Sequence, residues 1–305
     1  MEKTLNKFRK SENFPVASLL LPQAVRKPIL SLYNFARYAD EIADSQFLEP
    51  EEKLIKLEQL YNAIDKKKSD ELPYFLRDIF IHLNNNSYSK KHILNLLQAF
   101  MQDATKARYY SFHETLDYCQ KSATTVGKMF LEANEEFQAD FSASDKICIV
   151  LQLVNHLQDL KSDYEKLNRI YFDKAYINDE SELNSLTESV QVKTAKLKIL
   201  GVLSKNLQEG KKILKTLKSI RISIELATII NAAQHIIKRL EERDILKKRV
   251  RIKNKYKLLG LITAFGEIFF FETIKTGAKS LLSISQNGSS FLLPMLSLSG
   301  KTRRM

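Results

Sequence analysis

The chain has 305 residues, with 48 lysines and arginines against 36 aspartates and glutamates, and a formal net charge of +12. A chain of this length can bury about 75% of the surface of the unfolded polypeptide, as one large domain or as two fused ones. Two cysteines exclude a disulfide-stabilised secreted scaffold, and the charged, polar start of the chain does not resemble a cleavable signal segment. We therefore expect a cytoplasmic protein.

The distribution of glycine and proline predicts a mostly helical chain. The first of eight glycines is Gly127, and none of the six prolines lies between Pro73 and Pro294. No apolar and polar alternation bounded by hairpin turns is present, so strands are not expected. Helices are predicted, in chain order, over residues 24–46, 51–67, 72–83, 90–103, 112–135, 143–167, 190–216, 221–242 and 255–272. Residues 65–70 and 176–181 are predicted loops, and no repeat or interdomain linker is found.

Two pairs of aspartates lie in predicted helices more than a hundred residues apart. They are Asp40 with Asp44, and Asp159 with Asp163. Side chains four residues apart on a helix are neighbours, so each pair places two like charges together. Apolar or small residues flank both pairs, which puts the carboxylates beside a core face where an unpaired charge is costly. Because Mg²⁺ binds carboxylate oxygens and substrate phosphates together, two facing pairs would hold a diphosphate through metal ions.

The alternative for either pair is a solvated helix face, because acidic pairs with this spacing are common. The neighbouring residues favour a site. Arg37 lies one turn before the first pair, and Asn155 one turn before the second. The second helix is followed by Arg169 and Tyr171, which suit phosphate and cation contacts.

Three stretches of the chain resemble the squalene/phytoene synthase family. Residues 12–22 and the run YNFARYADEIAD at 33–44 resemble its opening, YCQKSATTVG at 118–127 resembles its central segment, and residues 155–171 resemble its second aspartate-rich motif. The resemblance covers about residues 11–260. The run NFPVAS at 13–18 and Gln158 are most similar to the bacterial hydroxysqualene synthases of the hopanoid pathway, because other branches more often have arginine at the position of Gln158.

The resemblance implies an all-α, isoprenoid-synthase-like bundle around a central apolar cavity, as a single domain over residues 1–305 in which 261–305 form an apolar extension. It implies an enzyme that uses Mg²⁺ to ionise a prenyl diphosphate. The hydroxysqualene branch implies conversion of presqualene diphosphate and water to hydroxysqualene and diphosphate, for which NADPH is not expected. The alternative is head-to-head condensation of two prenyl diphosphates to squalene, dehydrosqualene or phytoene. A non-catalytic assembly factor with this fold is a further alternative, although it should have lost some acidic ligands.

The same resemblance implies roles for individual residues. It implies magnesium ligands at Asp40, Asp44, Asn155, Asp159 and Asp163. It implies catalytic roles for the four aspartates and Tyr118. Substrate-binding positions are implied at Phe14, Tyr33, Arg37, Val126, Gly127, Gln152, Gln158, Arg169 and Tyr171. The arginines would bind diphosphate and the aromatic rings would stabilise a carbocation.

Several of these residues have structural alternatives. Any one aromatic residue can belong to the core, and Gly127 can serve close helix packing. Asp103, which also resembles a family position, can instead form a structural pair with Arg108. Arg169 lies six residues after Asp163 where five are expected, and a one-residue insertion there would shift Arg169 and Tyr171 relative to the diphosphate.

The positive charge is concentrated near the end of the resemblance. Residues 238–257 contain ten lysines and arginines against three acidic residues, and an interrupted apolar segment follows. This pattern favours a peripheral contact with an anionic membrane, on its inner face, or equally a solvated basic helix followed by a core helix. Nucleic acid is not expected as a partner, because no nucleic-acid-binding motif accompanies the run.

Overall fold

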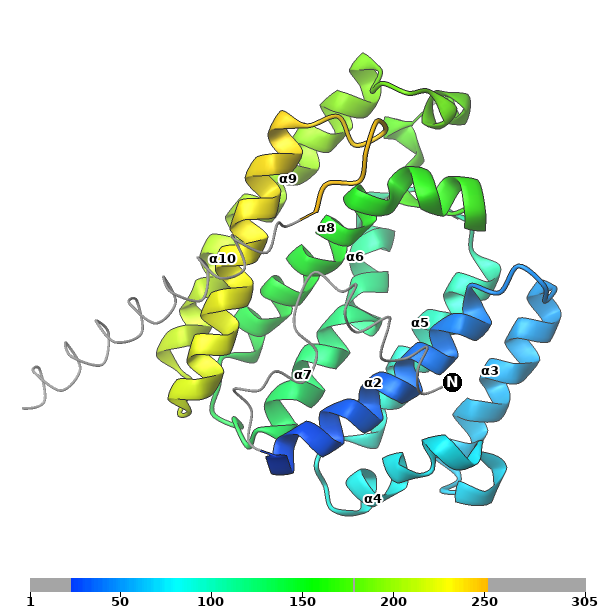
Figure 1. Cartoon of the computed structure of the whole chain (residues 1–305), viewed down its shortest axis with the longest axis vertical. Coiled ribbons are helices and arrows are strands. Elements are labelled where there is room, and N and C mark those ends of the chain that lie inside the picture. The colour runs from blue at the N-terminus through cyan, green and yellow to red at the C-terminus, as the bar shows by residue number, and fades with distance from the viewer. Residues whose placement is uncertain (1–22, 178, 252–305) are drawn as a thin grey trace, which may run out of the picture.

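The computed structural model describes residues 23–177 and 179–251, and the helices within these ranges are arranged in three layers (Figure 1). Helices α2, α3 and α5 form one side, α6, α7 and α8 form the middle, and α9 and α10 cover the other side. The helices span Gln23–Ala43 (α2), Pro50–Asp65 (α3), Asp78–Asn84 (α4), Lys90–Thr105 (α5), Phe112–Lys121 (α6), Ala123–Ala133 (α7), Phe141–Leu167 (α8), Val190–Gly210 (α9) and Ile220–Glu242 (α10). The prediction of an all-α bundle is confirmed.

Two predicted helices are wrong in detail. The helix predicted over residues 112–135 is two helices, because α6 ends at Lys121 and α7 begins at Ala123. The hydroxyl of Ser122 donates to the Tyr118 carbonyl, and Thr124 and Thr125 bond to carbonyls four residues earlier. Such hydroxyls compete with the helical backbone ladder and favour a break. The helix predicted over residues 72–83 is instead one 3₁₀ turn, Tyr74–Leu76, followed by α4, and a further 3₁₀ turn, Ser69–Glu71, precedes it.

Smaller differences concern a helix end and the loops. The helix predicted to reach residue 216 ends at Gly210 and continues as a 3₁₀ turn over Lys211–Lys215. The loop predicted over residues 176–181 contains parts of two 3₁₀ turns, Lys174–Tyr176 and Glu180–Asn184.

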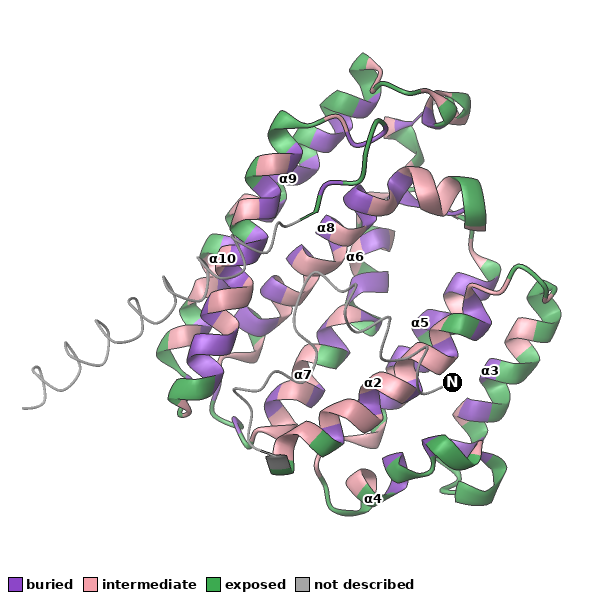
Figure 2. Ribbon diagram, viewed as in Figure 1, coloured by how far each residue is buried: buried purple, intermediate pink, exposed green. Residues whose placement is uncertain are grey.

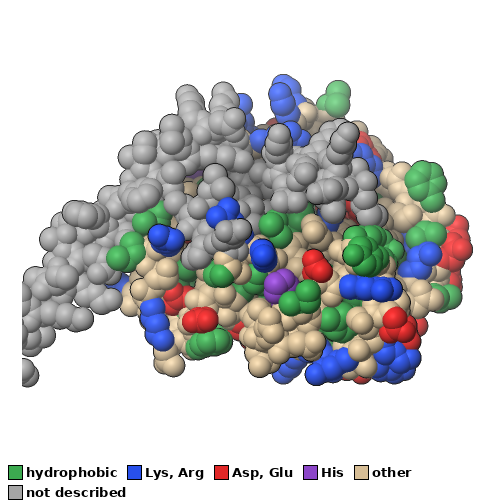
Figure 3. Space-filling model, turned by 60° about the horizontal axis from the view of Figure 1, so that its bottom comes forward, with side chains coloured by type: hydrophobic (Ala, Val, Ile, Leu, Met, Phe, Trp, Pro, Cys, Tyr) green, Lys and Arg blue, Asp and Glu red, His purple; other side chains and the backbone are tan. Residues whose placement is uncertain are grey.

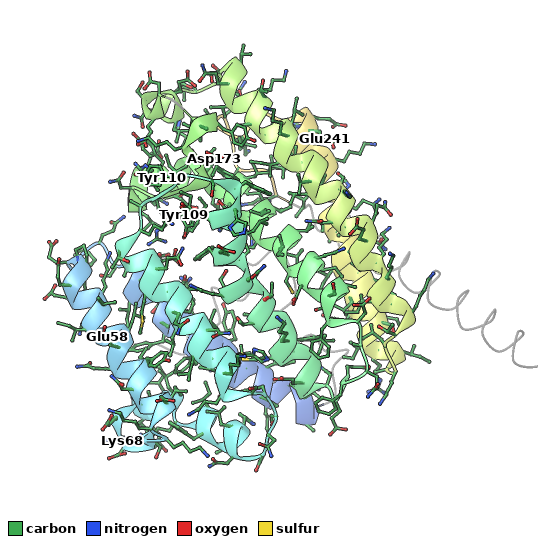
Figure 4. All side chains as sticks on the ribbon, turned by 180° about the vertical axis from the view of Figure 1, so that it is seen from behind. Glu58, Lys68, Tyr109, Tyr110, Asp173 and Glu241 are labelled. Carbon is green, nitrogen blue, oxygen red and sulfur yellow. The ribbon has the colours of Figure 1, made fainter. Side chains whose placement is uncertain are left out.

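A short parallel ladder that the sequence did not predict joins β1 (Arg108–Tyr109) to β2 (Ile170–Asp173). Figure 4 shows Tyr109, Tyr110 and Asp173 close together at this ladder. Strands of two and four residues are too short to produce an alternating pattern, which explains the omission. The ladder matters for function, because it holds the segment that follows α8 next to the segment that follows α5.

The buried apolar residues of the described ranges fall into two clusters. One lies among α2, α3, α4 and α5, and the other surrounds α8 and includes α9 and α10. Figure 2 shows buried residues on the inward sides of α5, α8 and α10, whereas the outer side of α3 is exposed. The first acidic motif lies at the end of α2, beside one apolar cluster, and the second lies on α8, beside the other.

Close contact between α7 and α8 depends on Gly127. A Cβ at this position would overlap with the Sγ atom of Cys148 and approach the hydroxyl of Ser144 to 3.3 Å. The structural alternative for Gly127 is therefore supported by the packing, independently of any contact with substrate.

We expect Gly127→Ala to lower the free energy of unfolding. Overpacking costs about 1–3 kcal/mol, which offsets the gain of about 1 kcal/mol in helix propensity. Urea unfolding of Gly127→Ala, of Cys148→Ala and of the double variant measures the coupling. The double variant should lose less free energy of unfolding than the two single variants lose together. Strictly additive losses would mean that the Sγ contact is not the cause.

Part of the basic run is described and folds back on the helical bundle. Arg239 donates to the carbonyl of Arg251, and Ile245, Leu246 and Val250 are buried. On the face shown in Figure 3, basic and acidic side chains are interspersed and do not form one basic patch. Each helix within residues 23–177 and 179–251 is too short or too polar to span a bilayer. Peripheral membrane contact stays a prediction, and Phe14, the predicted helix 255–272 and the apolar extension lie outside the described residues.

Candidate active site

The first acidic pair lies at the C-terminal end of α2, with Asp40 in the helix and Asp44 directly after it. Phe35, Ala39 and Ala43 on this helix are fully buried, which holds the neighbouring Asp40 and Asp44 at the edge of the core. Their side chains are 33% and 36% exposed. Burial, and then the charge of Asp44, raises the pKa of Asp40 to about 7.

The second acidic pair lies on α8 and faces the first. Val154 and Leu157 are buried, whereas Asp159 and Asp163 are half-buried. Burial raises the pKa of Asp163 to about 8, and the negative charges of Asp159 and Asp44 add to this rise. Since Asp44 directly follows α2, the two acidic pairs lie close enough to repel each other.

Three arginines pair with these aspartates. Arg37 lies 2.6 Å from Asp40, and Arg169 lies 2.9 Å from Asp44. Arg249, from the segment after α10, lies 2.6 Å from Asp159. The cluster therefore combines carboxylates, which suit a metal ion, with guanidinium groups, which suit a phosphate.

A buried polar network lies beneath the aspartates and centres on Asp103 of α5. The hydroxyls of Tyr118 and Tyr171 donate to its two carboxylate oxygens over 2.7 and 2.8 Å. Arg169 donates to the Asp103 carbonyl and to the Tyr171 hydroxyl, each over 2.9 Å. Burial raises the pKa of Asp103 to about 6, against the opposing effects of Arg169 and the two phenols. Arg169 thus connects this network to Asp44.

The proposed pair of Asp103 with Arg108 is wrong. Arg108 instead forms an ion pair with Glu180 at 2.7 Å, and the arginine near Asp103 is Arg169. Sequence proximity was misleading because the partner, Arg169, comes from the connection between α8 and β2.

The backbone at the end of α8 accounts for the position of Arg169. Asn168 adopts a left-handed conformation with φ of 50°, a conformation that asparagine tolerates better than most residues. The Arg169 amide then donates back to the Asp163 carbonyl over 3.1 Å. This turn accommodates the six-residue spacing and brings the guanidinium of Arg169 under Asp44.

An apolar pocket of about 310 Å³ lies between α7, α8 and α10. Four residues predicted to bind substrate or metal line it, namely Val126, Gly127, Gln152 and Asn155. Asn155 lies one turn before Asp159 on α8, so the pocket extends towards the acidic cluster. The structure thus places a hydrophobic space next to a charged site, as a prenyl diphosphate requires.

Other predicted site residues lie around this arrangement. Tyr33 lies on α2 one turn before Arg37, and the rings of Tyr118 and Tyr171 are buried with centroids 5.1 Å apart. Gln158 is buried and its amide donates to the carbonyl of Val250, so it anchors the segment after α10.

Two residues near the site were not recognised in the sequence as site residues. His156 is buried and stacks on Tyr171, with ring centroids 3.9 Å apart and planes 9° apart. Burial lowers its pKa to about 3, so the ring is neutral. Arg249 was seen only as part of the basic run. The sequence did contain a signal for His156. It lies four residues after Gln152, a predicted substrate-binding residue, and side chains with this spacing on a helix are neighbours.

The oxygen atoms of the predicted ligands are of the chemical type that binds magnesium. Carboxylate and amide oxygens are the ligands Mg²⁺ prefers, and the raised pKa values of Asp40 and Asp163 reflect crowded negative charge that a cation would relieve. Within residues 23–177 and 179–251, however, no three His, Cys, Asp or Glu side chains are gathered as a ligand group for one metal ion. The predicted ligand set therefore stays a prediction.

Comparison with known proteins agrees with this geometry. The family model described as squalene/phytoene synthase matches residues 8–255. The chain belongs to the squalene/phytoene synthase family. It is 34% identical to hydroxysqualene synthase from Sinorhizobium fredii, over 80% of this chain and 85% of that protein, and 34% identical to hydroxysqualene synthase from Rhodopseudomonas palustris, over 81% and 85%.

Solved structures show the same fold. A dehydrosqualene synthase is similar to this synthase with a TM-score of 0.70 at 16% identity, covering 87% of this chain and 95% of that one. A squalene synthase from Alicyclobacillus acidocaldarius has a TM-score of 0.66 at 21% identity, with coverage of 79% and 92%. The family assignment makes this chain a prenyl-diphosphate-utilising synthase and rules against the non-catalytic assembly factor.

The pKa values of this synthase's aspartates predict how magnesium affects its stability. The raised pKa values of Asp40 and Asp163 mean that the metal-free folded state binds more protons than the unfolded state between about pH 4 and pH 8. Their contribution to stability is therefore lost as the pH rises through this window. Mg²⁺ needs the ionised carboxylates, so the rise in Tm on adding Mg²⁺ should be larger near pH 8 than near pH 6.

Thermal unfolding with and without Mg²⁺ at the two pH values measures this effect. In Asp163→Asn part of the pH dependence should disappear, because one of the two titrating groups is gone while Asp40 still titrates. An equal Tm shift at both pH values in the unsubstituted protein would contradict the expectation.

Proposed function

We propose that this synthase ionises presqualene diphosphate with the help of Mg²⁺ and lets water capture the carbocation, giving hydroxysqualene and diphosphate. The observation that carries the proposal is the pair of facing acidic helices, α2 and α8, next to an apolar pocket. The relatives named hydroxysqualene synthase, matched over most of their length, support this reaction over others of the family.

The residues of the chain divide into two parts with different tasks. Asp40, Asp44, Asn155, Asp159 and Asp163 would hold Mg²⁺. When bound, the metal neutralises the charge that develops on the leaving diphosphate. Arg37 and Arg169 add charge-assisted hydrogen bonds to the same group, and both already lie within the cluster.

The remaining site residues handle the hydrocarbon and the cation. The wall formed by α7, including Val126 and Gly127, receives the prenyl chains. The buried rings of Tyr118 and Tyr171 provide aromatic faces, which stabilise positive charge. Asp103 holds both phenols and thereby fixes the orientation of these rings. Water capture consumes no hydride, so NADPH is not required.

The test uses the full-length protein with Mg²⁺ and presqualene diphosphate in water enriched in oxygen-18. Ionisation followed by water capture predicts hydroxysqualene that carries the label in its hydroxyl group. Unlabelled alcohol would mean cleavage of the phosphorus–oxygen bond, and no alcohol would refute the proposal. Hydrocarbon products formed from farnesyl diphosphate would instead support head-to-head condensation.

A further inference from the structure

Gln152 and His156 form a polar pair one turn apart on α8. Their Nε2 atoms lie 3.0 Å apart. Gln152 lines the apolar pocket, whereas the His156 side chain is in the interior, where the residue is only 5% exposed. The pair therefore links the pocket to the buried network without being part of the acidic cluster.

The identity of the bonded atoms fixes the direction of this hydrogen bond. An amide nitrogen can only donate, so Nε2 of His156 must accept, and the imidazole must be neutral with its hydrogen on Nδ1. The amide oxygen of Gln152 then remains available to accept a hydrogen bond from a molecule in the pocket. Water is the smallest donor that would fit there.

The His156 ring is held firmly enough to orient the amide. It stacks on Tyr171, whose hydroxyl is bound to Asp103 and Arg169. Its Nδ1 atom is buried and has no hydrogen-bond partner within the described part of the chain. A buried donor of this kind is normally satisfied by an ordered water molecule. The Nδ1 atom of His156 is therefore a second group in this region, besides the Gln152 amide oxygen, that could bind water.

We propose that the amide oxygen of Gln152 binds the water molecule that captures the carbocation, and that His156 is the positioning residue that holds this amide. The inference rests on the proposed function. It adds which residues make the product an alcohol instead of a hydrocarbon. Without an acceptor that holds water, this mainly apolar pocket would favour loss of a proton to give a hydrocarbon, because no nucleophile would be held near the cation.

The step is balanced without any further reactant. The water oxygen forms a bond to the cationic carbon, and the resulting oxonium ion loses one proton. The departed diphosphate accepts that proton, so the products are a neutral alcohol and hydrogen diphosphate. Nothing is oxidised or reduced.

The experiment compares two variants with the unsubstituted protein under Mg²⁺ and presqualene diphosphate. Gln152→Leu removes the acceptor, and His156→Phe keeps a ring to stack on Tyr171 but removes the nitrogen that fixes the amide. Both diphosphate release and the ratio of alcohol to hydrocarbon are measured. We expect the ratio of alcohol to hydrocarbon, compared at equal diphosphate release, to fall about tenfold in both variants, the discrimination that one hydrogen bond can supply.

Gln120→Leu provides the matched control, since Gln120 is exposed on α6 outside the pocket and the chemical change is the same. Its product ratio should be unchanged. An unchanged ratio in Gln152→Leu would overturn the inference, and so would a loss of diphosphate release at a constant ratio, which would place Gln152 in ionisation. An effect of Gln152→Leu but not of His156→Phe would overturn the role of His156. Failure of the unsubstituted protein to make any alcohol would refute the proposed function itself.

Discussion

Asp159→Asn is expected to lower the kcat for diphosphate release about 10²–10³-fold, the usual effect of removing one group that stabilises charge in a transition state. The amide that replaces this carboxylate cannot supply the negative charge that a magnesium ion at the cluster needs. The variant should still fold, because Asp159 is half-buried and the substitution conserves its shape. Steady-state release of diphosphate, together with circular dichroism, measures both expectations.

Asp145→Asn is the matched control on the same helix. Asp145 is also half-buried and pairs with Lys128 at 3.1 Å, but it lies more than three turns before Asp159 and outside the acidic cluster. Its loss should leave the kcat within about twofold, as expected for a residue that does not touch the reacting groups. Equal losses in the two variants would contradict the assignment of Asp159 to the site.

Arg169→Met should lower the free energy of unfolding by about 3–5 kcal/mol, because removing one partner of a buried ion pair leaves the other charge uncompensated. Arg169 is 6% exposed at its side chain and contacts Asp44, Tyr171 and the carbonyl of Asp103. The half-buried Asp44 still reaches solvent, so most of the loss should come from the 4% exposed carboxylate of Asp103.

A second substitution tests that explanation. In the Arg169→Met background, Asp103→Asn removes the uncompensated charge and should recover part of the stability. Lowering the pH should also help the single variant, because burial raises the pKa of Asp103 and a protonated carboxyl needs no counter-charge. Urea unfolding of the single and double variants at two pH values measures both effects. Additive losses that do not depend on pH would show that Arg169 acts mainly through packing.

The long helices could be predicted from sequence because their signals are local. The boundaries of α5, α8 and α10 lie within two residues of the predicted ones, since a serine or aspartate directly precedes each helix and apolar residues repeat at helical spacing. The break between α6 and α7 was missed because it depends on hydroxyl groups that bond backward, a competition that composition does not reveal.

The acidic pairs could also be predicted from the sequence, whereas several of their contacts with residues far along the chain could not. Each pair is visible within one helix, but the contact of Arg249 with Asp159 joins residues 90 positions apart, and that of Tyr171 with Asp103 joins residues 68 apart. Contacts of this range depend on how α5, α8 and the segment after α10 pack. The same limit explains the wrong choice of Arg108 as the partner of Asp103 and the omission of His156.

The most direct test of the account is the position of bound metal. Crystals grown with Mn²⁺ and inorganic diphosphate should show anomalous peaks between α2 and α8, with carboxylate oxygens of Asp40 or Asp44 and of Asp159 or Asp163 about 2.0–2.2 Å from the ions. Arg169 should then contact the diphosphate oxygens. Peaks elsewhere on the molecule, with Asp159 still paired to Arg249, would contradict the assignment of these two helices to a metal and diphosphate site.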